Sequence, residues 1–301
     1  MKILITGGAG FIGSNIVDAY IEDGHEVAIL DNLITGKERN LNPKAKFYKV
    51  DIRDKKIVDI LAEFKPEIIN HLAAQIDVRK SVADPAFTED VNVMGTINLL
   101  AAAVAAKVRK VIFSSTGGAL YGEIKEKEGA DENHPQEPIS PYAITKRGVE
   151  MYLYFYHVTY GFKYTILRYS NVYGPRQDPL GEAGVIAIFF GKMSKGENCT
   201  IYGDGKQLRD YVYVGDVCKA NLIALNQGDN SIYNVGTGIG ISVNELFTHL
   251  KDIMKFKGEA SYAPPRTGEL FRSVLNCKKI EKELGWKAKI EIRKGLELTV
   301  F

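Results

Sequence analysis

Cysteine is scarce in this chain of 301 residues. Its three cysteines, Cys199, Cys218 and Cys277, stand far apart in the sequence. They show neither the close pairs that bind zinc nor the even number that a disulfide framework needs. The sequence therefore predicts no metal site and no disulfide scaffold, as is typical of proteins from a reducing compartment.

Long hydrophobic runs are also missing from the sequence. No stretch approaches the roughly eighteen uninterrupted apolar residues that cross a membrane. The apolar start MKILI soon meets a glycine pair, too early for the apolar region of a signal peptide. We therefore expect a soluble, cytoplasmic protein without a membrane partner.

The chain has little net charge, at +2 from 39 basic and 37 acidic residues. Proteins that bind nucleic acid through their overall field carry a clear basic excess. We therefore expect no nucleic-acid partner. Any anion that the protein binds must be held by local groups.

Short apolar runs alternate with helical patterns in the first half of the chain. The predicted strands cover residues 2–6, 25–30, 46–51, 67–74 and 110–115, and the predicted helices cover 12–22, 54–64 and 92–106. Such alternation with near-continuous apolar strands is typical of a parallel sheet covered on both faces. The sequence predicts an α/β fold with a Rossmann-type, doubly wound parallel sheet.

After residue 165 the segments shorten, and glycine and proline become frequent. Segment 164–176 predicts one more strand that runs into a loop, and 210–225 predicts a short strand followed by a helix. Segment 241–254 predicts an amphipathic helix, with Ser242 and Glu245 in capping-box spacing. We expect these parts to form a smaller C-terminal substrate domain, interleaved with the first domain.

A glycine-rich turn joins the first predicted strand and helix. Gly7, Gly10 and Gly13 allow a tight turn and the close approach of a pyrophosphate to a helix N-terminus. The second strand is followed by Asp31, 18 residues after Gly13, near the position of a carboxylate that binds the adenosine ribose. Because a carboxylate there repels a 2′-phosphate, the pattern predicts NAD rather than NADP. A glycine turn with a purely structural use is the alternative.

Further cofactor contacts are expected at the strand ends, because ligands of open α/β sheets gather at the carboxyl ends of the strands. Polar or small residues follow the third and fourth predicted strands. The expected cofactor residues are Gly7, Gly10, Phe11, Ile12, Gly13, Asp31, Asn32, Asp51, Ile52, Leu72, Ala73, Ala74, Gln75, Asn92, Tyr142 and Lys146.

The stretch SPYAITKRG places Tyr142 four residues before Lys146, on one face of a predicted helix. A tyrosine with its ordinary pKa near 10 is a poor base at neutral pH. A cation one turn away, together with a positive nicotinamide ring, favours the phenolate. Thr116, after the strand at 110–115, offers a hydroxyl either to the reacting oxygen of the substrate or to Tyr142 itself. The set predicts acid–base catalysis, with an ordinary surface pair as the alternative.

These motifs, in this order, resemble the extended short-chain dehydrogenase/reductases over nearly the whole chain. RYSNVYGPRQ (168–177), GDGKQLRDYVYVGDV (203–217) and PPRTGEL (264–270) resemble the UDP-glucose 4-epimerase family. The resemblance implies a UDP-sugar substrate and a homodimer built on helices that include 92–106 and the one bearing Tyr142. It also implies an NAD-binding domain at 1–168 and 210–233, and a nucleotide-sugar-binding domain at 169–209 and 234–301.

The resemblance also assigns roles to individual residues. It makes Thr116, Tyr142 and Lys146 catalytic, with Thr116 and Tyr142 also touching the substrate. The implied substrate-binding residues are Asn171, Arg209 and Arg266 on the diphosphate, Glu269 on the uridine ribose, and Val185, Ile201 and Tyr202 along the nucleotide. Arginine suits phosphate because it binds in a bidentate manner. The alternatives are a surface salt bridge from Arg209 to Asp210 or Asp216 and a purely structural loop for Arg266.

The expected reaction follows from what the chain lacks after Thr116. Related sugar dehydratases carry an Asp-Glu pair there and decarboxylating relatives a Glu, whereas this chain has GGA at 117–119. The resemblance therefore implies epimerisation at carbon 4 by transient oxidation, with NAD staying bound. The resemblance also places Ser273 where the family has a residue that gates the pocket beside carbon 2 of the sugar, and this small side chain predicts tolerance of N-acetylhexosamines. A uronate 4-epimerase, signalled by Arg272, and an NAD-sensing binding protein are the alternatives. We expect His71, inside an apolar run, to be a satisfied core histidine.

Overall fold

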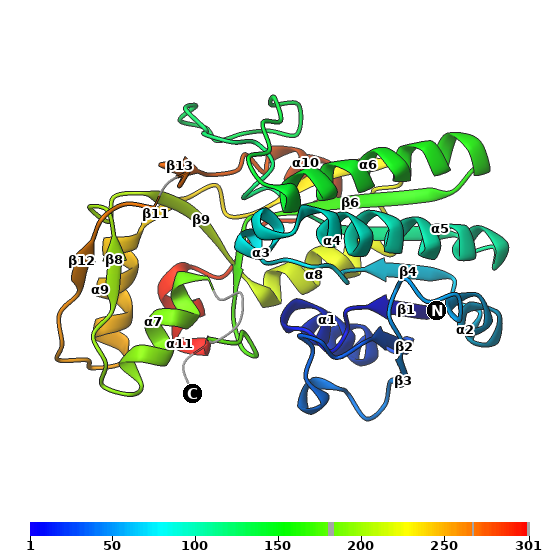
Figure 1. The fold of residues 1–301 in the computed structure, drawn as a ribbon, viewed down its shortest axis with the longest axis horizontal. Coiled ribbons are helices and arrows are strands. Elements are labelled where there is room, and N and C mark those ends of the chain that lie inside the picture. The colour runs from blue at the N-terminus through cyan, green and yellow to red at the C-terminus, as the bar shows by residue number, and fades with distance from the viewer. Residues whose placement is uncertain (180–183, 267, 300–301) are drawn as a thin grey trace. The chain divides into compact units, whose positions relative to one another are not determined.

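The computed structural model describes residues 1–179, 184–266 and 268–299, and the chain divides into two compact units (Figure 1). Unit 1 comprises Met1–Thr116, Pro138–Arg168 and Cys218–Tyr233, and unit 2 comprises Gly117–Glu137, Tyr169–Val217 and Asn234–Phe301. This division differs from the expected domains at two places, because 117–137 and 210–217 belong to unit 2.

Unit 1 is built on a seven-stranded sheet in the order β10-β6-β5-β4-β1-β2-β3. Its strands are β1 (Lys2–Thr6), β2 (Glu26–Asp31), β3 (Lys46–Lys49), β4 (Ile68–His71), β5 (Lys110–Thr116), β6 (Lys163–Tyr169) and β10 (Ser231–Val235). The pairs β1–β2, β2–β3, β1–β4 and β4–β5 are parallel. The strand order reverses between β1 and β4, where sheets of this kind bind ligands.

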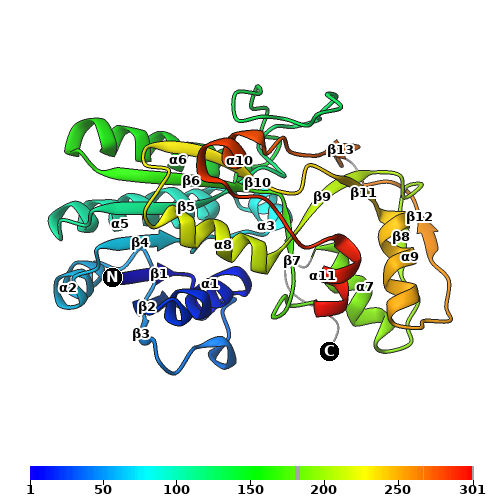
Figure 2. The same ribbon diagram turned by 180° about the vertical axis from the view of Figure 1, so that it is seen from behind.

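Helices cover both faces of this sheet, which confirms the predicted doubly wound fold. They are α1 (Phe11–Glu22), η1 (Glu38–Asn40), α2 (Ile57–Phe64), α3 (Val78–Ala83), α4 (Pro85–Glu89), η2 (Asp90–Met94), α5 (Gly95–Ala105), α6 (Pro141–Tyr160) and α8 (Val214–Ala224). Figures 1 and 2 show α5 and α6 on one face and α1 and α8 on the other.

Neighbouring residues of β4 show how the two faces are packed, since successive side chains of a strand point to opposite faces. Ile69 lies in the apolar core that α2, α5 and α6 cover. Asn70, one residue later, donates to Tyr20 of α1 and to Asn221 of α8, at 2.9 Å each. One face is therefore purely apolar at this point, and the other includes a buried hydrogen-bonded group.

Unit 2 contains shorter elements. Its strands are β7 (Asn171–Tyr173), β8 (Thr200–Tyr202), β9 (Leu208–Tyr213), β11 (Gly240–Ser242), β12 (Ser261–Ala263) and β13 (Arg272–Ser273). Its helices are α7 (Val185–Met193), α9 (Val243–Ile253), α10 (Lys278–Leu284) and α11 (Ile292–Thr299). β9 pairs with β7, β11 and β13, and β8 pairs with β12. An apolar core joins α7, α9 and α11.

Two predicted elements differ in the structure. Segment 164–176 forms two strands instead of one, because β6 ends at Tyr169 and β7 pairs with β9 in another sheet. Only one residue separates the two strands, so the sequence pattern does not mark the change of partner. The helix predicted at 92–106 is preceded by the π-helix η2 and becomes regular at Gly95. The helix at 241–254 has the predicted capping box of Ser242 and Glu245.

None of the helices in the described part of the chain is both long enough and apolar enough to cross a membrane.

Candidate active site

The glycine turn brings its backbone against the end of β4. Gly7 has a φ of +72°, and a Cβ built on it would lie 2.8 Å from the backbone nitrogen of Ala73. A Cβ on Gly13 would lie 2.2 Å from the carbonyl oxygen of Gly7. Neither position therefore accepts a side chain.

The turn ends at Gly10, the N-cap of α1. The next three residues, Phe11, Ile12 and Gly13, contribute the first-turn N–H groups, which in a helix have no acceptor four residues earlier. These groups and the positive end of the helix dipole suit a phosphate.

Asp31 closes β2 beside this turn and is buried. Its carboxylate accepts from Ala9 N at 3.0 Å and from Leu33 N at 2.8 Å. Burial raises the pKa of Asp31, and the two backbone donors oppose that rise. Gly36 lies so close that a Cβ on it would be 2.8 Å from Oδ1 of Asp31. The carboxylate is thus held in one orientation at the end of β2.

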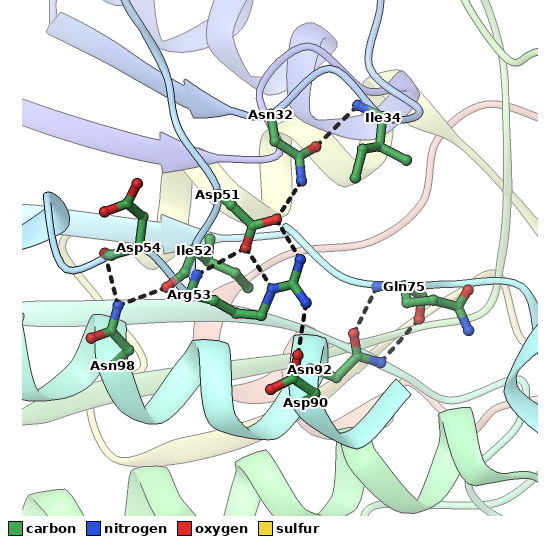
Figure 3. Close-up of polar contacts among 10 residues, drawn as sticks. All are labelled: Asn32, Ile34, Asp51, Ile52, Arg53, Asp54, Gln75, Asp90, Asn92 and Asn98. Atoms are coloured by element: carbon green, nitrogen blue, oxygen red, sulfur yellow. Dashed lines mark hydrogen bonds and ion pairs between the residues drawn. The ribbon is translucent and has the colours of Figure 1, made fainter. Parts of the chain in front are cut away.

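Figure 3 shows a polar cluster around Asp51, which follows β3. We call it the Asp51 cluster and define it as Asn32, Asp51, Arg53 and Asp90. Hydrogen bonds from the Arg53 guanidinium lower the pKa of Asp51 to about 2. Ile52, another expected cofactor residue, has a buried side chain, and its carbonyl oxygen accepts from Asn98 at 2.9 Å.

The segment after β4 contains Leu72, Ala73, Ala74 and Gln75, which are all half-buried. Asn92 is buried and holds this segment: Oδ1 accepts from Gln75 N at 2.7 Å, and Nδ2 donates to Gln75 O at 2.9 Å. Nδ2 also donates to the hydroxyl of Thr145 in α6, at 2.9 Å. Asn92 therefore ties the end of β4 to the helix that carries Lys146.

His71 is a satisfied core histidine, as predicted. Nδ1 lies 2.7 Å from the Thr6 hydroxyl, and Nε2 lies 2.8 Å from the Thr96 hydroxyl. Because Thr96 donates its own proton to Asn92 O, it accepts from His71, which assigns the hydrogen of the neutral ring to Nε2. Burial lowers the pKa of His71 to about 3, and the nearby Lys146 adds to this.

Tyr142 and Lys146 lie near the start of α6, and the local sequence explains why the helix begins there. The Ser140 side chain caps the helix by accepting from Ala143 N, and Pro141 occupies the first turn. Both residue types favour a helix start at these positions. Tyr142 is half-buried and Lys146 is buried.

Lys146 points toward the end of β5. Its Nζ donates to the carbonyl oxygen of Ser114 at 2.8 Å. The same nitrogen lies 4.7 Å from the centre of the Phe113 ring and 6.0 Å from the centre of the Tyr142 ring. Thr116 is the last residue of β5 and is buried. Unit 1 thus places an amine beside a phenol at the strand end where Thr116 lies.

Lys146 makes the stability of the fold depend on pH. Burial lowers the pKa of this amine to about 7 from its ordinary 10.5, and Glu150 acts in the opposite direction. Between these two values the unfolded chain binds more protons than the folded one. Stability therefore rises with pH across that window.

The variant Lys146→Met lacks this titration. We expect its free energy of unfolding, relative to that of the wild type, to be highest at pH 6 and to fall as the pH rises toward 9. Urea denaturation of both proteins without cofactor at pH 6, 7.5 and 9 measures the difference. A difference that stays constant or grows with pH would contradict the lowered pKa of Lys146.

Sequence reasoning missed the buried ion pair behind Lys146. Glu150, one helical turn further on, forms an ion pair with Arg168 of β6, and their side chains are 1% and 0% exposed. The Ser115 hydroxyl donates to Oε1 of Glu150 at 2.6 Å. The only signal in the sequence for the Glu150–Arg168 pair is that Glu150 lies four residues after Lys146, on the same face of the helix. Together these contacts fix α6 against β5 and β6.

Unit 2 contains a pocket of about 780 Å³, which is within the range of small-molecule sites. Among the residues that line it are Tyr202, Tyr262, Arg266, Glu269 and Phe271. The Arg266 guanidinium lies 4.0 Å from the centre of the Tyr202 ring. The pocket therefore combines aromatic surface with charges of both signs. Tyr262 and Phe271 were not among the expected site residues.

Arg209 pairs with Glu269, at 3.7 Å between Nη2 and Oε1. The two carboxylates considered as alternative partners of Arg209 accept hydrogen bonds from other groups. Asp210 accepts from the backbone and hydroxyl of Thr237, and Asp216 accepts from the backbone N–H groups of residues 289 and 290. The structure thus brings together Arg209 and Glu269, which are 60 positions apart in the sequence.

Asn171 begins β7, and its Nδ2 donates to Asp210 O at 3.2 Å. The nearest side-chain atom of Asn171 is 3.7 Å from where a Cβ on Gly118 would lie. Ser273 is buried, and its hydroxyl donates to Gly118 O at 3.2 Å. Gly118, Asn171 and Ser273 are therefore neighbours within unit 2.

The remaining expected residues differ in what they offer to a ligand. Val185, at the start of α7, is half-buried. The side chain of Ile201 lies in the core of unit 2, so its backbone is what a ligand can reach. Arg272 donates to Lys127 O at 2.9 Å and to Glu126 O at 3.4 Å. Both contacts come from Nη2, while Nε of Arg272 is buried without a hydrogen-bond partner among the described residues.

Comparison with known proteins places these features in a family. Residues 3–236 match the model of the NAD dependent epimerase/dehydratase family. A UDP-glucose 4-epimerase from Mycolicibacterium smegmatis is 44% identical, with 100% of this chain and 97% of that protein covered.

Two solved structures are also similar. The crystal structure of UDP-glucose 4-epimerase with UDP-glucose from Thermotoga maritima has a TM-score of 0.98 and 50% identity, and covers 100% of this chain and 97% of that one. The UDP-glucose 4-epimerase from Thermus thermophilus, in complex with NAD, has a TM-score of 0.95 and 47% identity, and covers 100% and 98%.

Proposed function

Since this chain belongs to the NAD dependent epimerase/dehydratase family, we propose that it is a UDP-hexose 4-epimerase that uses bound NAD. The observation that carries the proposal is the buried Lys146 amine, which lies 6.0 Å from the Tyr142 ring and donates to Ser114 O at the end of β5. A lysine beside a phenol at a strand end is suited to moving a proton on and off a sugar hydroxyl.

The residues of unit 1 fit NAD. Because Gly7 packs against the backbone of Ala73 and Gly13 against that of Gly7, the turn is tight, which suits a pyrophosphate at the start of α1. The carboxylate of Asp31, fixed at the end of β2, is placed for the ribose hydroxyls. We therefore assign the pyrophosphate to Gly7–Gly13, the ribose to Asp31 and Asn32, and the adenine edge to Asp51 and Ile52. Leu72–Gln75 and Asn92, at the end of β4, would hold another part of the cofactor.

When bound, NAD supplies the group that accepts the hydride of sugar carbon 4 and later gives this hydride back. Tyr142 takes the proton of the 4-hydroxyl in the first half of the reaction and gives it back in the second half. The charged form of Lys146 favours the ionised phenol electrostatically. The hydroxyl of Thr116 binds the reacting oxygen.

Epimerisation follows because the segment after Thr116 offers no acid to eliminate water. Residues 117–119 are GGA, and a Cβ on Gly118 would already touch Asn171. With no elimination, the 4-keto sugar is reduced again, and return of the hydride to the opposite face inverts carbon 4. The cofactor ends in its starting state, so the reaction needs no added NAD.

Unit 2 supplies the contacts for the nucleotide diphosphate. Arg209 and Arg266 are the cations for the phosphates, and Glu269, already paired with Arg209, accepts from the uridine ribose. Asn171 binds the diphosphate, while Val185, Tyr202 and the backbone of Ile201 follow the nucleotide. A chain with a net charge of only +2 needs such local cations to bind a dianion.

The substrate range follows from Ser273, whose small side chain beside Gly118 leaves room for an N-acetyl group at carbon 2. We propose that N-acetylhexosamines are accepted as well as glucose and galactose. The scarce cysteine supports a cytoplasmic location.

A panel of UDP-sugars tests this function. The purified protein is incubated without added NAD with UDP-glucose, UDP-N-acetylglucosamine and UDP-glucuronate, and products are followed by proton NMR. We expect the 4-epimers of UDP-glucose and of UDP-N-acetylglucosamine, without a net redox change. Accumulation of a keto sugar contradicts epimerisation, and conversion of UDP-glucose alone contradicts the role of Ser273.

We also propose that the protein forms a homodimer through α6. Apolar side chains repeat along this helix at a spacing that forms one stripe. The exposed side chains of this stripe are Ile144, Met151, Phe155 and Val158, and Tyr154 lies beside it. Exposed apolar surface of this extent marks an interaction site, and a second copy of the same helix supplies a matching stripe.

Charged residues in the stripe are expected to separate the subunits. We expect the double variant Phe155→Lys/Val158→Lys to run as a monomer in size-exclusion chromatography with light scattering, while the wild type runs as a dimer. Val58→Lys, at an exposed apolar position in α2, is the control and is expected to stay dimeric. A double variant with the mass of the wild-type dimer would show that α6 is not the interface.

A further inference from the structure

The Asp51 cluster joins three separate segments of unit 1 (Figure 3). Asn32 follows β2, Asp51 follows β3, and Asp90 opens η2. Arg53 connects two of these segments, because it forms ion pairs with Asp51 at 2.9 Å and with Asp90 at 2.7 Å. None of the motifs in the sequence assigns a function to this arginine.

Arg53 supplies most of the hydrogen bonds that Asp51 receives. Oδ1 of Asp51 accepts from N and Nε of Arg53, both at 2.9 Å. Oδ2 accepts from Nη2 of Arg53 at 2.9 Å and from Asn32 Nδ2 at 2.8 Å. These four donors engage both oxygens of the carboxylate. The orientation of Asp51 therefore depends on Arg53.

The surroundings of Arg53 are themselves fixed. Its guanidinium lies 5.7 Å from the centre of the Phe87 ring. Asn98 donates to the carbonyl oxygens of Ile52 at 2.9 Å and of Asp54 at 3.1 Å, which holds the loop on either side of Arg53. A group held in this way presents one conformation to a ligand and loses little entropy on binding. The low pKa of Asp51, caused by Arg53, keeps the carboxylate charged at neutral pH.

We propose that Arg53 is a positioning residue that sets how tightly NAD is retained, by fixing Asp51 and the ends of β2 and β3 against η2. The inference rests on the proposed use of NAD. These contacts of Arg53 lie within the rim of the cofactor site and not at Tyr142 or Lys146. Loss of Arg53 therefore weakens retention of the cofactor and leaves the chemistry of the loaded protein unchanged.

The test compares Arg53→Gln with the wild type. NAD released by heat denaturation of the purified proteins is quantified by chromatography, and the dissociation constant of NAD is measured by equilibrium dialysis. We expect Arg53→Gln to bind NAD about tenfold to a hundredfold more weakly, since it loses charge-assisted hydrogen bonds. Its turnover number at saturating NAD is expected to equal that of the wild type.

Two further variants make the test specific. Asp90→Asn removes one ion pair at an exposed carboxylate and leaves the Asp51–Arg53 contacts in place, so we expect a smaller loss of NAD affinity. Lys46→Gln removes a positive charge and an exposed ion pair with Glu63 from β3, and is expected to bind NAD like the wild type.

Each outcome decides the matter. Wild-type retention of NAD by Arg53→Gln overturns the inference, as does a turnover number that falls and is not restored by added NAD. If Arg53→Gln does not fold, the NAD affinity of Asp90→Asn is the deciding measurement, and an affinity equal to that of the wild type overturns the inference. A wild-type protein that neither holds NAD nor epimerises UDP-glucose refutes the proposed function instead.

Discussion

Tyr142→Phe is expected to lower the turnover of UDP-glucose by at least about a thousandfold, because the phenol is the group that carries the proton in both halves of the reaction. Loss of one hydroxyl from a half-buried ring leaves the helix start at Ser140 and the amine of Lys146 in place. We therefore expect NAD content and the free energy of unfolding to match the wild type. Turnover is measured by NMR of the two sugars, and NAD by release on denaturation.

Tyr48→Phe serves as the matched control, since it removes a hydroxyl from β3 at the far edge of the same sheet. Its turnover is expected to equal that of the wild type. This pair also separates an enzyme from an NAD-sensing binding protein, which needs no Tyr–Lys base. Unchanged turnover in Tyr142→Phe would refute the proposed mechanism, even if epimerisation itself is observed.

Glu150→Gln is expected to destabilise unit 1 by about 3–5 kcal/mol, the range measured when one partner of a buried ion pair is removed. The Arg168 guanidinium is fully buried and donates to both oxygens of Glu150, from Nη2 to Oε2 at 2.6 Å and from Nε to Oε1 at 2.9 Å. A glutamine offers one acceptor and places its amide against the guanidinium. The charge of Arg168 then loses the carboxylate that pairs with it. Urea denaturation of both proteins measures the difference.

Two variants show whether the cause is the unpaired charge. In Glu150→Gln/Arg168→Met the buried charge is gone, so we expect most of the lost stability to return. Glu63→Gln breaks an exposed ion pair with Lys46 and is expected to leave the free energy of unfolding almost unchanged, because water screens both charges. If the double variant is no more stable than Glu150→Gln alone, the charge is not the cause.

Local requirements were the predictable part of this protein. The positive φ of Gly7 and the contact of Gly13 with Gly7 are properties of one turn, so a short sequence pattern is enough to find them. The same holds for the capping box of Ser242 and Glu245. The strands of the first half were also predictable, because each is a continuous apolar run between polar turns.

Contacts between distant segments were not predictable. Arg168 was a strand residue in an apolar run, and its burial against Glu150 depends on β6 lying next to β5. Arg209 meets Glu269 because β9 pairs in parallel with β13, in a register that aligns residue 209 with Ser273. The sequence contains the residues of these pairs but no local signal for the register. The bond of Arg53 to Asp90 has the same origin.

The central claim is that hydrogen leaves carbon 4 of the sugar and returns to it within one cycle. Its most direct test uses UDP-glucose deuterated at carbon 4, incubated with the purified protein in ordinary water without added NAD. We predict UDP-galactose that keeps its deuterium at carbon 4, with no net reduction of the bound cofactor. Product that carries solvent hydrogen at carbon 4 would contradict the account.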